Sequence, residues 1–587
     1  MDVLIRNPLS VVRARAREIP VGKLRQSSDW GIPGFFESKL KLNEEGDALN
    51  EIPSLNVTAS QNIEDKSLVR FRCMVQDILD PEFYTGIYEE VCAKTGTKVL
   101  KTAKYQDVVD IPAGCDISIG QNSITYSRLP LFCIPIPGES KWVHRALGNK
   151  MSQQIQSKDG KQRDKRKRSE VARSTPEKSH VPRITKMKRG RPGESKFEDL
   201  APMDEVDYTS RKGSSTADPH IWNLQKGVMV KMYDTESGKF KVNDVVEFVG
   251  VFSASPLLAD EDEDGAWGRF NPPSSLVPRL HVITSRKLDS GMGLVPSLDA
   301  ESFIKKLNAS RKPLLRTRAS LLAHLKDLLG GDSVASEAML MHLVSRVHYR
   351  RSGHIIGKFS LGISGVPPKT AMKLISFMES ILPAVKPIEV TVSAMNKAAY
   401  MPVKDYNLNH LAQGELQAAA GTHIVLDETK LSEGKLLEKG IKNFSAAQQV
   451  ISAQQLNFDF KYHKITFNTD TPVLILTKGK KSIFKCDCSV DIKGAESRGI
   501  REVSEASLRS FREYLLLART LNVEIPKEIT SQIQEDFVAL RKANPKLPEA
   551  SMHLRMGCSR LLATTFLETN LTAKRWTYTG PLFKLLR

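Results

Sequence analysis

Hydrophobic and polar residues alternate along several short stretches in the first half of the chain, a pattern typical of β-strands. The clearest is Leu68–Asp77, whose apolar side chains fall on one face at every second position. Phe83–Val91 follows the turn at Asp80-Pro81 and is predicted to be the return strand. Further strands are expected at Val99–Asp107, Leu131–Pro135, Val228–Tyr233, Val245–Phe252 and Leu280–Ile283. Short strands separated by turns predict a small β-barrel or sandwich, in which Gly250 suits a bulge or a barrel corner.

The first 65 residues carry a weaker pattern. Apolar residues at Leu4, Leu9 and Val12 indicate one short helix, and Trp30–Leu42 indicates a second. We expect the large side chains of this region, Phe36 among them, to dock on a neighbouring domain rather than to form an open binding surface.

From residue 298 onward, segments with apolar residues at helical spacing alternate with short apolar runs typical of strands. Leucines at helical spacing predict a helix that Gly330-Gly331 ends, and Asp332 or Ser333 is predicted to cap the next one, Val334–Val347. The segments that follow are expected to be His354–Ile363 (strand), Thr370–Ile381 (helix), Ile388–Val392 (strand), Leu408–Ala419 (helix), Thr422–Asp427 (strand), Asn457–Phe467 (alternating) and Val473–Leu476 (strand). This rhythm predicts a parallel or mostly parallel sheet. After Glu502, three amphipathic helices are expected to form a compact bundle whose apolar stripes need no cofactor.

A basic segment interrupts the strand pattern at residues 146–225. Between Met151 and Leu200 the sequence holds fifteen Lys and Arg against seven Asp and Glu, with almost no large apolar residues. Such a stretch cannot bury a core, so it is predicted to be a disordered insert within one β-domain. Its first basic cluster, Lys165, Arg166, Lys167 and Arg168, is a candidate nuclear import signal. A second motif, Arg189, Gly190, Arg191 and Pro192, is a weak minor-groove candidate that implies non-specific phosphate attraction at most.

Composition narrows the class of protein. The chain has 587 residues, of which 40% are hydrophobic and 26% charged, and a net charge of +19. This length predicts three or four domains. The seven cysteines form no Cys-x-x-Cys pair, so a zinc site is not expected and reduced thiols in cytosol or nucleus are. No apolar run resembles a signal peptide or approaches the ~20 residues that cross a bilayer, so we expect an intracellular protein without a membrane partner.

Two adjacent carboxylates are the strongest candidate for chemistry. Asp427 and Glu428 end an apolar run within Gly421–Lys430, which would place them at the carboxyl edge of a buried strand. In a nucleotide-hydrolysing domain the first acid would hold Mg²⁺ and the second would orient a water. The alternative is a buried strand that ends in a solvated acidic loop. A phosphate-binding loop upstream would decide between them.

The better candidate for that loop lacks the chemistry, and the other near-match, Gly353–Phe359, is one residue short and has no Ser or Thr. The segment Gly362–Thr370 lies between a predicted strand and a helix, and it ends in Lys369 and Thr370. Pro367 and Pro368 remove two backbone N–H donors where phosphate would be cradled. No metal-ligand spacing, catalytic triad motif or small-molecule site stands out elsewhere. We therefore predict no catalytic residues and no cofactor, with Lys369, Thr370, Asp427 and Glu428 as remnants of a nucleotide site.

Three segments resemble parts of the MCM helicase subunits, which are AAA+ proteins. Val242–Phe252 resembles a strand of their OB domain, Gly421–Lys430 their Walker B strand, and Leu508–Ala518 the first helix of their helical lid. By this resemblance Arg560 would fall near the phosphate-sensing arginine of the lid, and Thr477 stands where a sensor asparagine is expected. The chain lacks the family's phosphate loop and its arginine finger.

The whole pattern is more similar to the MCM-binding protein family. The strings that carry the resemblance are Val69–Tyr84, Ile134–Trp142, Ser275–Val282 and His423–Thr429. It implies a non-catalytic nuclear partner of MCM subunits that acts in assembly or unloading of the replicative helicase, in DNA replication and in chromosome cohesion. The chain would be a distant, catalytically degenerate relative of the helicase subunits that covers faces normally joining neighbouring subunits.

The expected fold is α/β plus all-β. An N-terminal segment (1–65) would precede an OB-like β-barrel domain (66–290) that carries the insert. A degenerate AAA+-like α/β domain (298–500) and a C-terminal lid-like helical bundle (501–587) would follow. Two other functions stay open: an active AAA+ ATPase or helicase-like motor, and a DNA-binding protein that acts through the basic insert.

Overall fold

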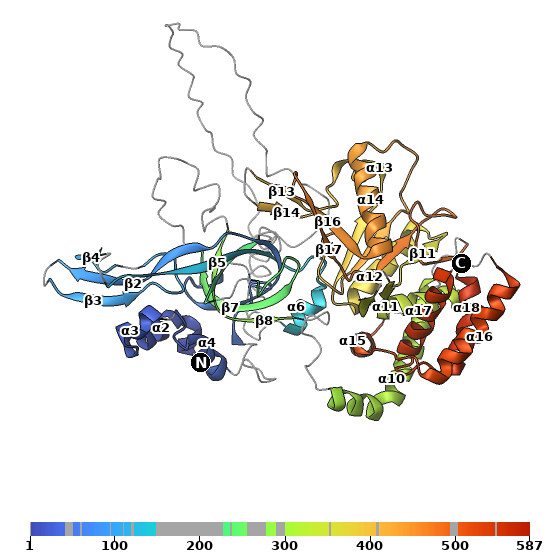
Figure 1. The fold of residues 1–587 in the computed structure, drawn as a ribbon, viewed down its shortest axis with the longest axis horizontal. Coiled ribbons are helices and arrows are strands. Elements are labelled where there is room, and N and C mark those ends of the chain that lie inside the picture. Colours follow the sequence, from blue (N-terminus) through green and yellow to red (C-terminus); the bar gives the residue numbers. More distant parts are fainter. Residues whose placement is uncertain are drawn as a thin grey trace, which may run out of the picture.

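A computed structural model shows an elongated molecule with a β-rich half and an α/β half (Figure 1). It describes residues 2–40, 51–147, 227–254, 277–288 and 300–586, apart from short gaps at 27, 59–61, 94–95, 110, 119–121, 235–237, 352–353, 407–409, 494–502 and 546–548. The basic insert, with the candidate import signal Lys165–Arg168 and the motif Arg189–Pro192, lies outside the described residues. Those two predictions therefore stay predictions.

Five strands of the first half close into a ring. They are β1 (Leu68–Ile78), β5 (Ile124–Ile134), β6 (Val228–Tyr233), β7 (Val245–Ser253) and β8 (Arg279–Lys287). The hydrogen-bonded order is β1-β7-β8-β6-β5, and β5 returns to β1, so the sheet is a ring rather than a sandwich. All neighbours are antiparallel except β6 and β8, which are parallel. Alternate residues of β1, Val69 to Val75, fill the interior of the ring as the sequence predicted.

Gly250 occupies a bulge, also as predicted. The register between β7 and β8 shifts between Val249 and Gly250. A Cβ added at Gly250 would overlap the carbonyl oxygen of His281 and would lie 2.8 Å from its carbonyl carbon. Only glycine lets the two strands approach this closely.

The expected hairpin between the first two strands is wrong. β2 (Glu82–Cys92) does not pair with β1 but with β5, β3 (Lys98–Thr102) and β4 (Cys115–Ser118). Both edges of β1 are already taken by β5 and β7. The chain therefore crosses over at Asp80-Pro81, and β2, β3 and β4 extend from the ring as a wing (Figure 1).

Short helices at the start of the chain pack against the ring. They are α1 (Asp2–Arg6), α2 (Pro8–Glu18), α3 (Val21–Gln26) and α4 (Ile32–Lys39). Trp30 and Phe36 are buried in a cluster that includes Tyr105 and Tyr233 of the β-half. The prediction that these side chains dock on a neighbour rather than form a surface is confirmed.

A parallel five-stranded sheet forms the centre of the second half. Its order is β12 (Val385–Glu389), β15 (His423–Asp427), β18 (Val473–Leu476), β11 (Leu361–Ser364) and β19 (Cys488–Asp491). All neighbours are parallel, as the alternating pattern predicted. Alternate residues point to opposite faces: Val425 joins the cluster with α11 and α12, while Ile424 and Leu426 join the cluster with α13 and α14.

Helices cover both faces of this sheet. On one side lie α10 (Ala300–Leu328), α11 (Ser333–Val344), α12 (Pro368–Ile381) and the C-terminal helices; on the other lie α13 (Val392–Lys397) and α14 (Glu438–Ala453). Asp332 caps α11 as expected, because its Oδ1 accepts hydrogen bonds from the N–H groups of Val334 and Ala335. Neither α13 nor α14 is among the helices predicted from the sequence.

The C-terminal bundle has one helix more than expected. The described residues hold α15 (Glu505–Thr520), α16 (Lys527–Ala543), α17 (Glu549–Thr565) and α18 (Ala573–Leu585). Trp576 of α18 is fully buried and donates its indole N–H to Asp536 of α16 at 2.7 Å. Pro581 and Gly580 inside α18 weaken its sequence signal, and tertiary burial stabilises it instead.

Two segments differ from their predicted secondary structure. His354–Ile363 is not one strand, because the chain breaks at Gly357 (φ +91°) into β10 (His354–Ile356), which pairs with β9 (Tyr349–Arg351), and β11. Leu408–Ala419 is not a helix, since it holds β14 (His410–Ala412) and turns. β14 pairs with β13 (Val403–Asp405), which in turn meets the hairpin of β16 (Gln455–Asp459) and β17 (Lys464–Asn468).

Contact with the ring accounts for the second difference. The carboxylate of Asp77 in β1 accepts hydrogen bonds from Leu411 N at 2.7 Å and Lys404 Nζ at 2.9 Å. Gln76 donates to Leu411 O and to Gln417 Oε1, both at 3.0 Å. These bonds need an extended backbone at Leu411, so tertiary contacts override the helical pattern.

A second contact between the halves follows the end of β5. There Gly138 accepts a hydrogen bond from Val385 N at 2.8 Å, and Ser140 N donates to Pro383 O at 2.8 Å. Trp142, in α6 (Lys141–Leu147), donates its indole N–H to Leu382 O at 3.0 Å. We call residues 134–142 the joint. The helix that begins at its end, α6, lies between the halves in Figure 1.

Candidate functional site

The two predicted carboxylates lie at the carboxyl edge of the parallel sheet, where the sequence placed them. Asp427 ends β15, and its Oδ1 accepts hydrogen bonds from the backbone N–H of Thr429 at 2.9 Å and from its hydroxyl at 2.7 Å. This closes a local turn that occupies one carboxylate oxygen. Asp427 is thus engaged in shaping the loop after β15.

Glu428 is buried and holds a neighbouring loop. It is 2% exposed, and its Oε1 accepts a hydrogen bond from Ser482 Oγ at 2.7 Å. Burial raises the pKa of Glu428, although hydrogen bonds to Ser482 and Thr477 oppose this. Ser482 belongs to the segment between β18 and β19, so Glu428 fastens that segment to the end of β15.

The backbone of the turn after β11 is already paired. Gly365 N donates to Gly479 O at 3.1 Å, and Val366 N donates to Thr477 O at 2.9 Å. The next two residues, Pro367 and Pro368, have no N–H to offer. A phosphate needs several converging free N–H groups, and this turn does not present them.

The other two predicted nucleotide-site residues, Lys369 and Thr370, differ in solvent exposure. Thr370 is buried in the first turn of α12, whereas Lys369 beside it is exposed to solvent. In the described part of the chain, the side-chain hydrogen bonds of Asp427 and Glu428 go to Thr429 and Ser482 rather than to Lys369 or Thr370.

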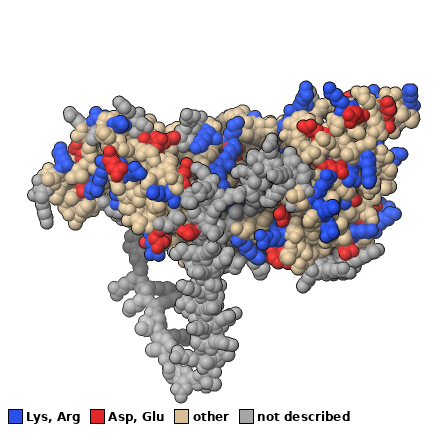
Figure 2. Space-filling model, turned by 90° about the horizontal axis from the view of Figure 1, so that it is seen from below, with Lys and Arg blue, Asp and Glu red and all other residues tan. Residues whose placement is uncertain are grey.

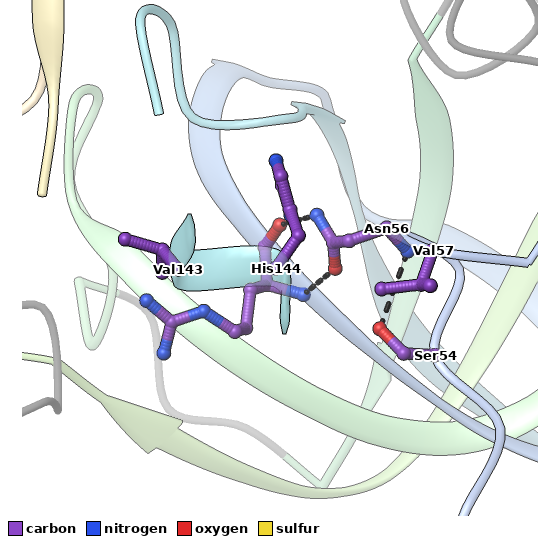
Figure 3. A pocket seen from close by; sticks show the side chains of 6 residues that line it. Ser54, Asn56, Val57, Val143 and His144 are labelled. Carbon is purple, nitrogen blue, oxygen red and sulfur yellow. Dashed lines mark hydrogen bonds between the residues drawn. The ribbon is translucent and has the colours of Figure 1, made fainter. Parts of the chain in front are cut away.

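Cavities large enough for a nucleotide would reach about 300 Å³ or more. Two small cavities in the described part of the chain each measure about 10 Å³. Neither is lined by Asp427 or Glu428, whose end of the parallel sheet we call the acidic edge. The first lies where residues before β1 meet α6 (Figure 3). In it Asn56 pairs with the backbone of Arg72 through its amide N and O atoms, at 2.7 and 2.8 Å. This cavity is a packing gap with room for about one water.

Arg560, suggested as a phosphate-sensing lid arginine, does not face the acidic edge. Its guanidinium donates to Asn522 Oδ1 at 3.1 Å. It lines the second small cavity with His348 and Gly357, which precede β11. That assignment from the resemblance is corrected, because the arginine lies beside residues that come before the strand.

A buried histidine pair near the amino end of the sheet escaped the sequence analysis. His342 and His423 are both fully buried, with ring centroids 5.2 Å apart. His423 Nε2 lies 3.3 Å from His342 O, and the buried Arg519 donates to Gly421 O at 3.1 Å. Burial lowers the pKa of His342 to about 4, and burial followed by the nearby Arg519 lowers the pKa of His423 well below its usual value. No spacing in the sequence signals this pair, because its members come from α11 and β15.

This pair predicts acid sensitivity. Unfolded histidines bind a proton below about pH 6.5, while the folded pair stays neutral, so the free energy of unfolding falls as pH drops from about 6.5 towards 4. For His342 the free energy of unfolding should be about 2 kcal/mol lower at about pH 5 than at neutral pH, because each pH unit below about 6.5 contributes about 1.4 kcal/mol. Melting temperatures measured between about pH 7.5 and 5 should fall steeply, and His342→Gln should flatten that slope. Equal slopes for the wild type and His342→Gln would contradict the assignment.

Surface charge on one face of the molecule is mixed. In Figure 2, Lys and Arg side chains lie among Asp and Glu side chains over both halves, without one continuous basic strip on that face. In the described residues no group of three metal-ligating side chains is gathered. No described helix is long and apolar enough to cross a bilayer.

Comparison with known proteins assigns the family. A family model described as "Mini-chromosome maintenance replisome factor" matches residues 36–584. The mini-chromosome maintenance complex-binding protein of Gallus gallus is 32% identical over 619 residues, covering 97% of this chain and 95% of the relative. Proteins of that name from Homo sapiens and Arabidopsis thaliana are 31% and 29% identical, covering 95% and 97% of this chain and 94% and 96% of their own lengths. The resemblance inferred from the sequence is confirmed, and the chain belongs to the mini-chromosome maintenance replisome factor family.

Proposed function

We propose that this chain is a non-catalytic nuclear binding protein of the MCM replicative helicase complex. It associates with MCM subunits, regulates assembly or unloading of the helicase on chromatin during DNA replication, and supports sister chromatid cohesion. The observation that carries the proposal is the family match, which extends over residues 36–584. Relatives that carry the name of an MCM complex-binding protein cover nearly the whole chain.

The state of the acidic edge supports a non-catalytic role. Asp427 and Glu428 make contacts that shape loops, and the turn before α12 has its first N–H groups paired and its next two positions filled by proline. The carboxylates are thus accounted for by structure alone. We propose that the α/β half keeps the shape of a nucleotide domain without its phosphate chemistry.

The strand arrangement supports the proposed relation to helicase subunits. The ring of five strands, with one parallel pair, is compatible with an OB-type Greek-key barrel. The parallel sheet has its first strand, β11, inside the sheet between β18 and β19, as in nucleotide-binding α/β folds whose ligand edge lies at the strand ends. We assign an N-terminal segment (1–65), an OB-like domain (66–290), an AAA+-like domain (298–500) and a lid-like bundle (501–587).

Co-purification tests this function. The tagged full-length chain, expressed in its own cell type and recovered from nuclear extract, should bring down MCM subunits that mass spectrometry identifies. The purified chain should show no ATP turnover above that of a buffer blank. Recovery without MCM subunits would contradict the binding role, and ATP turnover that Asp427→Ala abolishes would contradict the non-catalytic role.

A further inference from the structure

A stripe of apolar side chains on α14 is packed against protein at one end and exposed to solvent at the other. The stripe starts at Leu437, the N-cap residue of α14, continues through Ile441 and Phe444, and ends at the polar Gln448. These residues share one face because they are spaced by four, three and four positions. The end of the stripe at Phe444 and Gln448 is covered by the segment between β18 and β19. Phe444 stacks on Phe484 with centroids 5.1 Å apart.

The other end of the stripe, at Leu437 and Ile441, is exposed to solvent. The exposed fractions of Leu437 and Ile441 are 58% and 55%. Ile483, next to the ring that covers Phe444, is 41% exposed. Leu437 and Ile441 thus continue the packed stripe onto the surface, and Ile483 adds an exposed aliphatic side chain on the flanking segment. Exposed apolar side chains beside a packed region are expected where a further segment would complete the packing.

The segment that flanks the stripe is held rigidly. Gln448 and the backbone of Lys485 exchange two hydrogen bonds, each 2.9 Å long. Ser482 is tied to Glu428, and Gly479 O accepts the Gly365 N–H at 3.1 Å. This surface is therefore preorganised, and a ligand would lose little freedom of the protein on binding.

The charge around the open stripe is strongly positive. Four exposed lysines lie in the segment between β18 and β19, and in the part of the chain that the structure describes none of them has an ion-pair partner: Lys478, Lys480, Lys481 and Lys485. Lys435 and Lys439 add to the charge beside Leu437, where the exposed acids are Glu433 and Glu438. Glu438 is paired with Lys442 at 2.7 Å.

We propose that this surface, Leu437, Ile441 and Ile483 with the four lysines, is the docking site for an acidic protein segment that carries apolar anchor side chains. The inference rests on the proposed function and names the surface and chemistry of that contact: an acidic segment of an MCM subunit. Apolar anchors fill the open end of the stripe, and carboxylates of the segment face the unpaired lysines.

The chemistry favours a protein segment over a nucleic acid. Phosphates would use the lysines but leave the aliphatic residues exposed, because bases stack on aromatic rings rather than on Leu and Ile. Glu428 gains a structural role in this view, since its bond to Ser482 fixes the segment that carries both Ile483 and the lysines.

Paired substitutions on the full chain test the surface. Ile441→Asp should weaken binding of purified MCM complex by about thirtyfold, the effect of losing a hot-spot anchor of about 2 kcal/mol. Val538→Asp is the matched control, because Val538 is a helical residue of similar exposure (51%) on α16. Biolayer interferometry gives the affinities, and melting temperatures show that both variants are folded.

A charge reversal tests the lysines separately. Lys478→Glu, Lys480→Glu and Lys481→Glu together should slow association and flatten its dependence on salt. The control makes the same net change on the helical bundle and should leave both unchanged: Lys527→Glu, Lys542→Glu and Lys574→Glu.

The outcomes separate the two proposals. Equal MCM binding by wild type, Ile441→Asp and Val538→Asp overturns the surface alone. No MCM binding by wild type overturns the proposed function, and this inference with it. Binding of a labelled DNA duplex that the first charge reversal abolishes, with MCM binding retained, overturns the assignment in favour of nucleic acid.

Discussion

Gly138→Ala should loosen the contact between the two halves and destabilise the protein by about 3 kcal/mol, the combined cost of a left-handed backbone at a non-glycine residue and of overpacking. Gly138 has φ +76°, and a Cβ there would lie 2.6 Å from the carbonyl oxygen of Val385. That carbonyl belongs to the first residue of β12, whose N–H donates to Gly138 O. Because neither backbone can shift without breaking this hydrogen bond, the substitution should weaken the contact between the two halves at the joint.

Urea unfolding and amide hydrogen exchange measure the effect. We expect a lower midpoint and faster exchange at the start of β12, because the joint no longer protects Val385. Gly96→Ala is the matched control: Gly96 has φ +65° with nothing within 4 Å of the added Cβ, so it incurs the backbone cost alone. A Gly138→Ala variant no less stable than Gly96→Ala would show that the close contact does not matter.

Around Arg72 the joint is reinforced by a buried ion pair. Its guanidinium donates to Glu139 Oε1 at 3.2 Å, and both side chains are 4% exposed or less. Charges buried this deeply must stay paired, because a lone charge costs several kcal/mol of desolvation. The ion pair therefore ties β1 to the joint.

Gly250→Ala should have an effect of similar size on the ring, about 3 kcal/mol from overpacking against backbone. The added Cβ would overlap His281 O and would lie 2.9 Å from Val282 Cα, both backbone atoms of β8. The strands must separate to admit it, which breaks the β7–β8 pairing in a closed ring that has no free edge to yield.

Thermal unfolding followed by circular dichroism tests this effect. A lower transition is expected for Gly250→Ala, and the contrasting variant is Gly557→Ala. Gly557 lies in α17 with nothing within 4 Å of an added Cβ, so alanine there should stabilise the helix by about 0.8 kcal/mol. Equal melting temperatures for Gly250→Ala and wild type would contradict the role of the bulge.

Local patterns predicted most of the elements. Alternation in Leu68–Asp77 and in Val245–Phe252 found two ring strands, and Gly250 was placed at the bulge it occupies. Asp332 was one of two residues proposed as the cap of α11, and it is the cap. These features depend on neighbours within a few residues, which is the range over which sequence patterns act.

Two positions without a backbone N–H after β11 were also evident from the sequence. Prolines at 367 and 368 cannot donate hydrogen bonds in any fold. The structure adds that the preceding N–H groups, of Gly365 and Val366, are taken by the segment after β18. At the same end of the sheet, Asp427 and Glu428 accept hydrogen bonds from Thr429 and Ser482.

Residues distant in sequence decided the rest. Leu408–Ala419 has a helical pattern, yet Leu411 is held extended because its N–H donates to Asp77 and its carbonyl oxygen accepts from Gln76. β2 follows β1 closely but pairs with β5, because both edges of β1 are filled by strands that come later.

By itself, then, the sequence determined the types of most strands and helices, the two prolines after β11 and the family resemblance. Only the tertiary structure decided which strands pair, how the joint holds the halves together, and that His342 meets His423. It also decided that the stripe on α14 ends uncovered at Ile441. The physical reason is that periodicity reports which face of an element is apolar, whereas burial, pairing and pKa depend on the atoms that the rest of the chain brings against that face.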